Sequence, residues 1–403
     1  MIYKIMDKAS IFSLILSRAS RSLSAGIIFV IFPYLVIVQL KYSPLILGFA
    51  YTLGTLATAI LGLVLGYIAD LFSRKYSLIL ASLLLPISTV ILYLNHSLPI
   101  IFLASALGGY SATGAVAGGG TGGAAMPIQN ALIAELTDQS NRTFYFSFLT
   151  FLAGVAASFG SYLAGLFNIN EGFLIATILA FISAIVLIPI KSKNIRANNV
   201  SLKSKIVIGK FSITGMLNGF SMGLITPFLI PFFILVYHIP KSEMSIYTFL
   251  SSLIASITIL LAPYLDKKMG FLKSITITRG IASFLTLIMP IIRFLPLSLA
   301  IYLIFPSLRI VALPVQQRAM VDMVSQDEVG RAMGINQVTR LASSSASTSL
   351  TGYLFSESEI ELPFFISSGI MFLNIYLYFR FFSNKDEVNR SSRGSSLFKS
   401  NGN

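Results

Sequence analysis

The chain contains no cysteine, only two histidines and few charged residues. Without cysteine it can form no disulfide and offers no thiolate for catalysis. Two histidines without a close acidic cluster do not support a metal site, so we expect neither a metal nor another cofactor. Charged residues make up 11% of the 403 residues, whereas soluble proteins average roughly 25%. The composition therefore excludes an ordinary soluble domain.

Apolar residues take the place of the missing charge, and 55% of the chain is hydrophobic. They form segments that are long enough to cross a bilayer as helices. Six of them lie near residues 22–40, 44–65, 76–94, 98–122, 143–167 and 172–190. Six more lie near residues 211–237, 245–264, 274–292, 296–317, 333–355 and 362–382. The sequence predicts an all-α integral membrane protein with about twelve transmembrane helices.

The net charge of +14 is unevenly distributed along the chain. When the amino terminus is assigned to the cytoplasm and the spans alternate, the basic clusters at 74–75, 191–210, 267–273 and 385–399 all fall on the cytoplasmic side. The outer turns hold only Lys41, Lys241 and Arg293 as basic residues. This distribution follows the positive-inside rule. We expect a multi-pass protein of the cell (plasma) membrane with both termini in the cytoplasm and with no nucleic-acid partner.

The beginning of the chain is not typical of a cleaved signal peptide. Its apolar run at residues 11–16 is short and is followed at once by Arg18 and Arg21. A signal peptide usually has a longer uninterrupted apolar region. We therefore expect the first helix to be retained.

A polar stretch at residues 191–205 separates two groups of six predicted spans. Its composition predicts a flexible linker. The last residues, 383–403, are rich in serine, asparagine and arginine and are predicted to be disordered. The predicted organisation is a first six-helix bundle at 1–190, a linker at 191–205, a second bundle at 206–382 and a tail at 383–403.

The two groups of spans carry the same residue types in the same order and at similar spacing. For example, a proline precedes an aspartate by 37 residues in the first half and by 35 in the second. The matched pairs are Pro33 with Pro231, Asp70 with Asp266, Pro127 with Pro314, Gln129 with Gln316, Gly165 with Gly352 and Arg142 with Arg331. A single match would carry little weight, but several in one order indicate a duplicated six-helix unit.

The region 108–123 of the first half contains eight glycines. It is no phosphate-binding loop, because no Gly-Lys-Ser/Thr ending follows. Glycines at four-residue spacing are typical of closely packed membrane helices. The alternative is that the fourth helix is locally unwound where it lines a pathway.

The turn at residues 66–75 reads Gly-Tyr-Ile-Ala-Asp-Leu-Phe-Ser-Arg-Lys. It resembles the loop signature of the major facilitator superfamily, Gly-x-x-x-Asp-x-x-Gly-Arg-Lys. Gly66, Asp70, Arg74 and Lys75 match, while Ser73 replaces the second glycine. The resemblance implies two parallel six-helix bundles with pseudo-twofold symmetry that move a small molecule by alternating access.

The charged turn has acidic and basic companions at the same membrane level. Glu135 and Arg142 lie there in the first half, and Asp266, Lys268, Asp322 and Arg331 lie there in the second. Buried carboxylates need basic or helix-terminal donors. The resemblance implies that this set forms a cytoplasmic gate that locks the outward-facing state. The alternative is that these charges only fix the topology.

The resemblance also implies that helices 1, 4, 7 and 10 surround the pathway. Arg309 falls in the tenth span, roughly 13 Å from its cytoplasmic end at ~1.5 Å per residue. No acidic residue falls in the middle of any predicted span, so an anionic ligand is one candidate partner, and helix carbonyls or hydroxyls such as those of serines 343–345 are the alternative. Arg279 is expected to extend to the membrane interface instead. The predicted substrate-binding residues are Arg309, Asn218, Tyr110, Thr113, Ser221, Gln316 and Arg340.

The fifth predicted helix contains Gly160-Ser-Tyr-Leu-Ala-Gly165. It resembles a signature of drug–proton antiporters of the superfamily, Gly-Pro-x-x-Gly-Gly, but Ser161 and Ala164 depart from it. The first hypothesis is efflux of small amphipathic compounds, with protons as a candidate coupling partner. The second is an organic-anion carrier that uses Arg309.

A non-transporting receptor or sensor on the same fold is the alternative from another class. No paired carboxylates or nucleophile–base set is visible, so we do not expect an enzyme. The expected partners are a small-molecule substrate and the lipid bilayer, and the resemblance implies a monomer.

Overall fold

The computed structural model describes residues 8–110, 123–136, 139–190, 204–324 and 328–383, and every regular element among them is helical. In the first half the helices are α1 (Lys8–Pro33), α2 (Pro44–Leu71), α3 (Arg74–Leu94), α4 (Leu98–Gly108), α6 (Met126–Leu136), α7 (Gln139–Leu166) and α8 (Ile169–Ile185). In the second half they are α9 (Lys205–Ile225), α10 (Leu229–Tyr237), α11 (Lys241–Thr258), α12 (Ala262–Ile288), α13 (Leu295–Met323), α14 (Val329–Ser356) and α15 (Leu362–Phe382). A π-helix, η1 (Tyr34–Gln39), and three 3₁₀ turns, η2 (Gly123–Ala125), η3 (Thr226–Phe228) and η4 (Ile259–Leu261), complete the set.

The predicted all-α membrane architecture is confirmed. Each of the twelve predicted spans overlaps helical segments of the described residues. The helix α4 covers only the first part of the fourth span, and η2 and α6 lie beyond its predicted end, whereas α9, η3 and α10 supply the seventh. Within the described ranges, eight helical stretches are long and apolar enough to cross a membrane, and the longest, Lys241–Ile288, covers two predicted spans. Gly270 interrupts that stretch with φ 74° and ψ 169°, a backbone conformation that glycine adopts readily.

The first helix differs from the prediction in where it begins. It starts at Lys8 rather than near residue 22, so Arg18 and Arg21 lie inside it instead of preceding it. Both side chains are buried. The apolar-run criterion was wrong here because it ends a span at a charged residue, whereas a helix inside a bundle can hold an arginine on a face that its neighbours cover.

Local sequence signals explain several helix ends. A proline near the first position opens α2, α4, α12, α13 and α15, where the missing N–H costs nothing. Asn168 and Glu171 form a reciprocal capping box at the start of α8, with hydrogen bonds of 2.8 and 3.0 Å. Gly109 in the left-handed conformation ends α4.

Within each half, glycines allow two helices to cross at close range. A Cβ at Gly26 of α1 would lie 1.9 Å from the carbonyl oxygen of Ala157 in α7. In the second half, a Cβ at Gly219 of α9 would lie 2.1 Å from the carbonyl oxygen of Arg340 in α14. The repeated arrangement supports the duplicated six-helix unit, because the first and fifth spans of each half cross in the same way.

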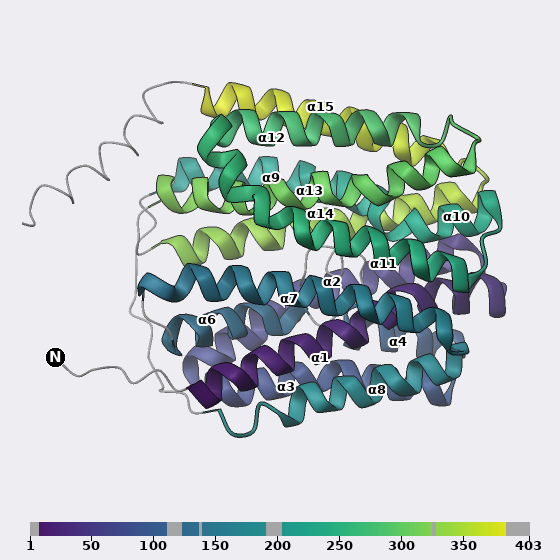
Figure 1. Cartoon of the computed structure of the whole chain (residues 1–403), viewed down its shortest axis with the longest axis horizontal. Helices are drawn as coiled ribbons and strands as arrows, with labels where there is room; N and C mark the ends of the chain where they lie inside the picture. The colour runs from purple at the N-terminus through teal and green to yellow at the C-terminus, as the bar shows by residue number, and fades with distance from the viewer. Residues whose placement is uncertain (1–7, 111–122, 137–138, 191–203, 325–327, 384–403) are drawn as a thin grey trace, which may run out of the picture.

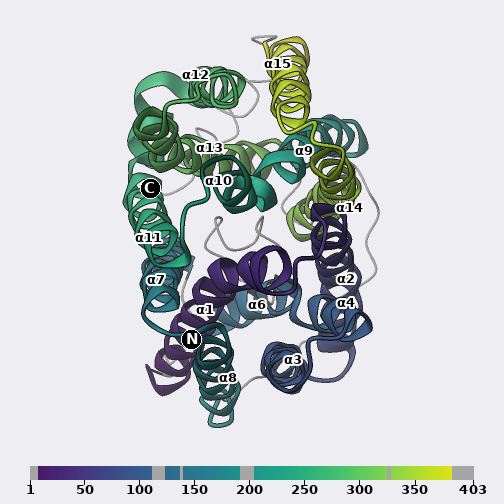
Figure 2. The same cartoon turned by 90° about the vertical axis from the view of Figure 1, so that its right-hand side faces the viewer.

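The two halves contact each other mainly through two helix pairs. In Figures 1 and 2, α2 lies beside α14 and α7 lies beside α11, while α1–α8 and α9–α15 form separate bundles. Gly48 and Gly352 bring α2 and α14 together, and Thr52 Oγ1 lies 2.6 Å from Ser349 Oγ across the same pair. Rigid-body rocking of two bundles uses interfaces of this kind.

The two ends of the molecule are packed differently. At one end, on the right of Figure 1, buried apolar residues of both halves, from Ile27 to Phe364, form a single group that we call the closed-end cluster. At the other end the first half has its own buried group, from Leu14 to Ile190, and the second half has another, from Ile208 to Phe382. Hydrogen bonds of Tyr34, Thr52 and Lys241 join the two halves, all toward the closed end. The structure is therefore closed at one end, and at the other end, which we call the open end, the halves are packed separately.

The predicted linker at 191–203, the tail after Ser383 and the glycine-rich residues 111–122 lie outside the described residues. The two hypotheses for the glycine-rich stretch and the predicted domain boundaries therefore stay predictions.

Candidate functional site

Arg309 of α13 is the centre of a polar group between α13 and α9. Its side chain is only 6% exposed. Nη1 donates to the hydroxyl of Ser221 at 3.2 Å, and Nη2 donates to Oδ1 of Asn218 at 3.4 Å. The guanidinium carbon lies 5.8 Å from the centroid of the Phe305 ring. Three of the predicted site residues are thus brought together by two helices that are far apart in sequence.

The side chains that accept hydrogen bonds from Arg309 are neutral, and these hydrogen bonds are long. Ser221 Oγ lies 2.7 Å from Ser367 Oγ of α15, and Asn218 Nδ2 lies 3.8 Å from the sulfur of Met222. Bonds of 3.2 and 3.4 Å are long for a charged donor, which normally approaches an acceptor to about 2.8 Å. The hydroxyl that accepts from Arg309 is that of Ser221, so the predicted alternative of a hydroxyl partner is met by a different serine from those named. Among the described residues, the positive charge of Arg309 therefore has no counterion.

Gln316 belongs to a different group from the one predicted. Its Oε1 accepts a 2.6 Å hydrogen bond from Arg279 Nη2, and Arg279 Nη1 donates at 2.8 Å to Asn374. The Arg279 guanidinium also lies 5.0 Å from the centroid of the Tyr378 ring. Arg279 is 1% exposed, so the expectation that it reaches the membrane interface is wrong. Its hydrogen bonds connect α12, on which it lies, to α13 and α15.

The remaining predicted binding residues are dispersed. Tyr110 is buried in the first half, and its hydroxyl accepts a 2.7 Å hydrogen bond from Ser88. Arg340 is partly exposed on α14, and its backbone lies against Gly219 of α9. Thr113 lies outside the described residues.

Arg21 of α1 is a buried arginine that the sequence analysis did not place in the site. Its Nη2 donates at 2.8 Å to Gln129 Oε1 of α6. Arg18, one turn earlier, is buried as well. A usable sequence signal exists: Arg21 precedes Pro33 by twelve residues, and Gly219, which lies between Asn218 and Ser221, precedes the matching Pro231 by twelve.

The predicted gate residues of the first half lie at the open end, on the last turn of α2, the first turn of α3 and the α6–α7 region. Gly66 has open space around its Cα, so packing does not require a glycine there. Lys75 lies 5.7 Å from the centroid of the Tyr76 ring, and Arg74 begins α3. The side chains of Asp70, Glu135 and Arg142 lie outside the described part of the structure.

In the second half, two of the predicted gate residues form ion pairs with Arg318, which the sequence analysis did not assign to the gate. Arg318 Nη1 lies 2.6 Å from Asp266 Oδ2, and Arg318 Nε lies 3.7 Å from Asp322 Oδ2. Lys268 lies 5.6 Å from the centroid of the Tyr264 ring rather than beside an acid. The side chain of Arg331 lies outside the described residues. The Arg318–Asp266 pair joins α13 to α12, and the Arg318–Asp322 pair lies within α13, so both pairs stay inside one half.

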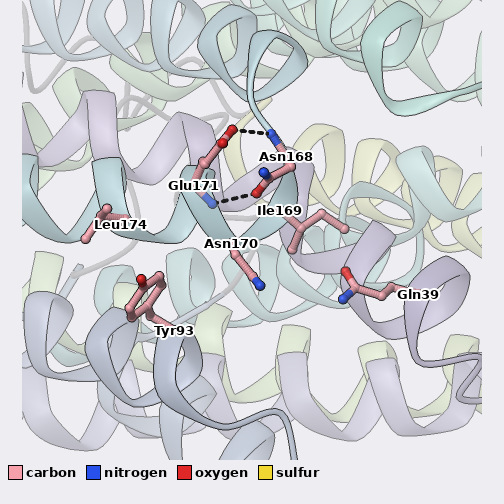
Figure 3. Close-up of a pocket in the computed structure, with 7 residues that line it drawn as sticks. All are labelled: Gln39, Tyr93, Asn168, Ile169, Asn170, Glu171 and Leu174. Atoms are coloured by element: carbon pink, nitrogen blue, oxygen red, sulfur yellow. Dashed lines mark hydrogen bonds between the residues drawn. The ribbon is translucent and has the colours of Figure 1, made fainter.

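A cavity of about 280 Å³ lies at the closed end of the first half (Figure 3). It is lined by Gln39, Tyr93, Asn168, Ile169, Asn170, Glu171 and Leu174. Asn168 and Glu171 satisfy each other through the capping box, as the dashed lines in Figure 3 show. The capping box engages two of the polar lining residues, and none of the lining residues belongs to the group around Arg309.

Comparison with solved structures shows what the chain resembles in three dimensions. A point mutant of the nucleoside transporter NupG matches with a TM-score of 0.75 and 13% identity, over 93% of this chain and 100% of that one. A bacterial homolog of the human lysosomal transporter Spinster, inward-facing and occupied, matches with a TM-score of 0.74 and 16% identity, over 92% and 95%. A D-xylose–proton symporter matches with a TM-score of 0.70 and 16% identity, over 94% and 97%. At these identities the likeness shows the fold alone.

The sequence comparison identifies the family. No curated protein matches the chain. The family description of the Major Facilitator Superfamily matches residues 14–310, which is more than half of the chain. With the twelve-span fold and the charged turn, this match makes the chain a multi-pass membrane transporter rather than an enzyme. The chain belongs to the major facilitator superfamily.

Proposed function

We propose that the chain carries an organic anion across the cell membrane by alternating access. The observation that carries the proposal is Arg309, a buried cation whose described partners are the neutral Asn218 and Ser221. An arginine near the middle of a membrane helix costs about 2.5–3.5 kcal/mol on insertion scales. A bound carboxylate, phosphate or sulfonate offsets that cost by supplying short, charge-assisted hydrogen bonds.

The distribution of charge around Arg309 supports an anionic substrate. Arg18, Arg21 and Arg279 are also buried. Among the side chains that the structure describes, the buried carboxylate is that of Glu328, at the open-end start of α14, where it accepts a 2.8 Å hydrogen bond from the Ser204 N–H. The described interior is therefore strongly positive, which favours anions and disfavours lipophilic cations.

We place the open end in the cytoplasm. The first residue of α1, the α2–α3 turn and the start of α9 lie at this end, and their basic residues follow the positive-inside rule. In this orientation both termini are cytoplasmic and the structure is inward-facing. Transport then requires the closed-end cluster to open while the open end closes.

Efflux of amphipathic compounds was the first hypothesis from the sequence, and it stays a prediction. The positive interior favours the anion hypothesis over it. Proton coupling also stays a prediction, since the carboxylates that the structure describes lie near the two ends of the bundle rather than beside Arg309. A receptor on the same fold would bind its ligand without moving it, which a flux measurement distinguishes.

The proposal is tested with full-length purified protein by thermal shift against benzoate, its neutral analogue benzamide, and tetraphenylphosphonium. We expect benzoate to raise the melting temperature, because a ligand at a hundredfold excess over Kd adds about 2.7 kcal/mol of stability. Arg309→Gln should abolish this shift. Arg293→Gln, which removes an 83% exposed arginine paired with Glu361 at 3.6 Å, is the matched control and should keep it. Stabilisation by the cation or by benzamide, unchanged in Arg309→Gln, would overturn the proposal.

We also propose that the charged residues at the open end act as a gate. Asp70→Asn keeps the size of the side chain and removes its charge, so it should slow transport in proteoliposomes severalfold while membrane insertion stays normal. Glu357→Gln, at an exposed position of the opposite end, is the control and should transport like the unchanged protein. Equal transport rates for Asp70→Asn and the unchanged protein would leave topology as the role of Asp70.

A further inference from the structure

Arg21 combines deep burial with unused hydrogen-bonding capacity. Its side chain is 2% exposed, and Nη2 is held by Gln129 Oε1. Gln129 is oriented in turn by its own Nε2, which donates to the Leu14 carbonyl at 3.1 Å. The Nε and Nη1 atoms of Arg21 are buried and have no hydrogen-bond partner among the described residues. Buried charged donors without acceptors are costly, so a group that supplies acceptors would bind strongly here.

The second half contains an arginine that serves as an internal comparison. Gln129 and Gln316 occupy matching positions of the sequence repeat, and each accepts a hydrogen bond from a buried arginine. In the second half, Arg279 also donates a 2.8 Å hydrogen bond to Asn374 and packs against the Tyr378 ring. In the first half, no described residue accepts a hydrogen bond from Nε or Nη1 of Arg21. The contrast separates a structural arginine, Arg279, from one with donors still free, Arg21.

The sequence repeat puts Arg21 at the level that Arg309 contacts in the opposite half. Arg21 precedes Pro33 by twelve residues, and Gly219 precedes the matching Pro231 by twelve. Gly219 lies between the two residues that Arg309 contacts, Asn218 and Ser221. Figure 2 shows α1 in one bundle and α9 and α13 in the other. Each half therefore contributes one buried arginine at this level: Arg21, which has two donors without a described acceptor, and Arg309, whose described acceptors are neutral.

We propose that Arg21 is a second anion-binding residue and that the substrate is an organic dianion, with one charged group bound by Arg21 and the other by Arg309. This inference rests on the proposed function and names its substrate class. A ligand held by both halves stabilises the state in which the halves close around it, because each half then contributes binding energy. A monoanion engages Arg309 and leaves Arg21 without a counterion.

The test compares ligands that differ by a single carboxylate, on full-length purified protein. Succinate is measured against butyrate and adipate against hexanoate, each by thermal shift at several concentrations to give an apparent Kd. In the unchanged protein we expect the better dicarboxylate to bind at least tenfold more tightly than its monocarboxylate. In Arg21→Gln we expect that advantage to disappear while monocarboxylate binding stays. Arg21→Lys, which keeps the charge, should recover part of it.

Two further variants keep the result interpretable. Arg279→Gln removes the structural arginine and should lower the melting temperature of the free protein while keeping the dicarboxylate advantage. Arg309→Gln should lose monocarboxylate and dicarboxylate binding together. A dicarboxylate Kd in Arg21→Gln within twofold of that in the unchanged protein, with Arg309 still required, would overturn this inference and leave the anion carrier standing. No stabilisation of the unchanged protein by any of these carboxylates would overturn both.

Discussion

Gly26→Ala is expected to prevent stable folding of the first half. The added Cβ would lie 1.9 Å from the carbonyl oxygen of Ala157 and 2.8 Å from its carbonyl carbon. Both atoms are backbone, so no side-chain rotation relieves the clash, and α1 and α7 must separate. Overpacking of this kind costs about 3 kcal/mol or more. The measurement is the fraction of detergent-extracted protein that elutes as a single monodisperse species.

Two further glycine variants test whether the loss of folding is specific to the crossing of α1 and α7. A Cβ at Gly160 of α7 would lie 2.0 Å from the Leu23 carbonyl oxygen, so Gly160→Ala should give the same loss through the same crossing. Gly369 of α15 has nothing within 4 Å of an added Cβ, so Gly369→Ala should be neutral or slightly stabilising. Normal elution of Gly26→Ala would show that α1 and α7 do not cross as described.

Lys241→Gln is expected to open the closed end. Lys241 begins α11, and its ammonium group donates to the carbonyl oxygens of Ala164 and Phe167 at the end of α7 in the other half. A cation at the carboxyl end of a helix is also stabilised by the helix dipole. Since Lys241 is partly exposed, we discount the interaction to about 1–2 kcal/mol, which corresponds to a factor of roughly 5–30 in the ratio of closed to open molecules.

The opening is measured by thiol labelling. The chain has no cysteine, so a single introduced one reports its own position. Val36→Cys places a thiol in the closed-end cluster, where Val36 is fully buried. With Lys241→Gln added, a membrane-impermeant maleimide should label this thiol several times faster. Lys41→Gln, which removes an exposed lysine at the same end, should leave the labelling rate unchanged. Equal rates for Lys241→Gln and its parent would rule out Lys241 as a lock.

The sequence predicted the spans and the repeat because both depend on local quantities. Span length follows from the thickness of the bilayer, and the repeat is visible as matched spacing. Arg309, Asn218 and Ser221 were each predicted as candidates, but their contact was not. That contact depends on how α13 packs against α9, and the 91 residues that separate Arg309 from Asn218 say nothing about it.

The errors have a common physical origin. Arg279 was expected at the membrane interface because it lies close to the end of its span, but Gln316 and Asn374 come from other helices and make its burial favourable. Arg21 was placed before the first span because a charged residue ends an apolar run. Arg318 joins Asp266 and Asp322, and a charge pattern alone did not single it out. Hydropathy treats each arginine as a cost, whereas the cost depends on its partners in three dimensions.

Because of the closed-end cluster, the same ligand has a different apparent affinity from the two sides of the membrane. A ligand on the side of the open end can bind the conformation described here. A ligand on the side of the closed end can bind only those protein molecules in which the closed-end cluster has separated. Its apparent dissociation constant is the intrinsic value divided by that fraction. Each 1.4 kcal/mol of packing in the cluster therefore weakens apparent affinity from that side about tenfold, although the binding residues are the same. The preferred loading side is thus set by apolar packing far from the arginines.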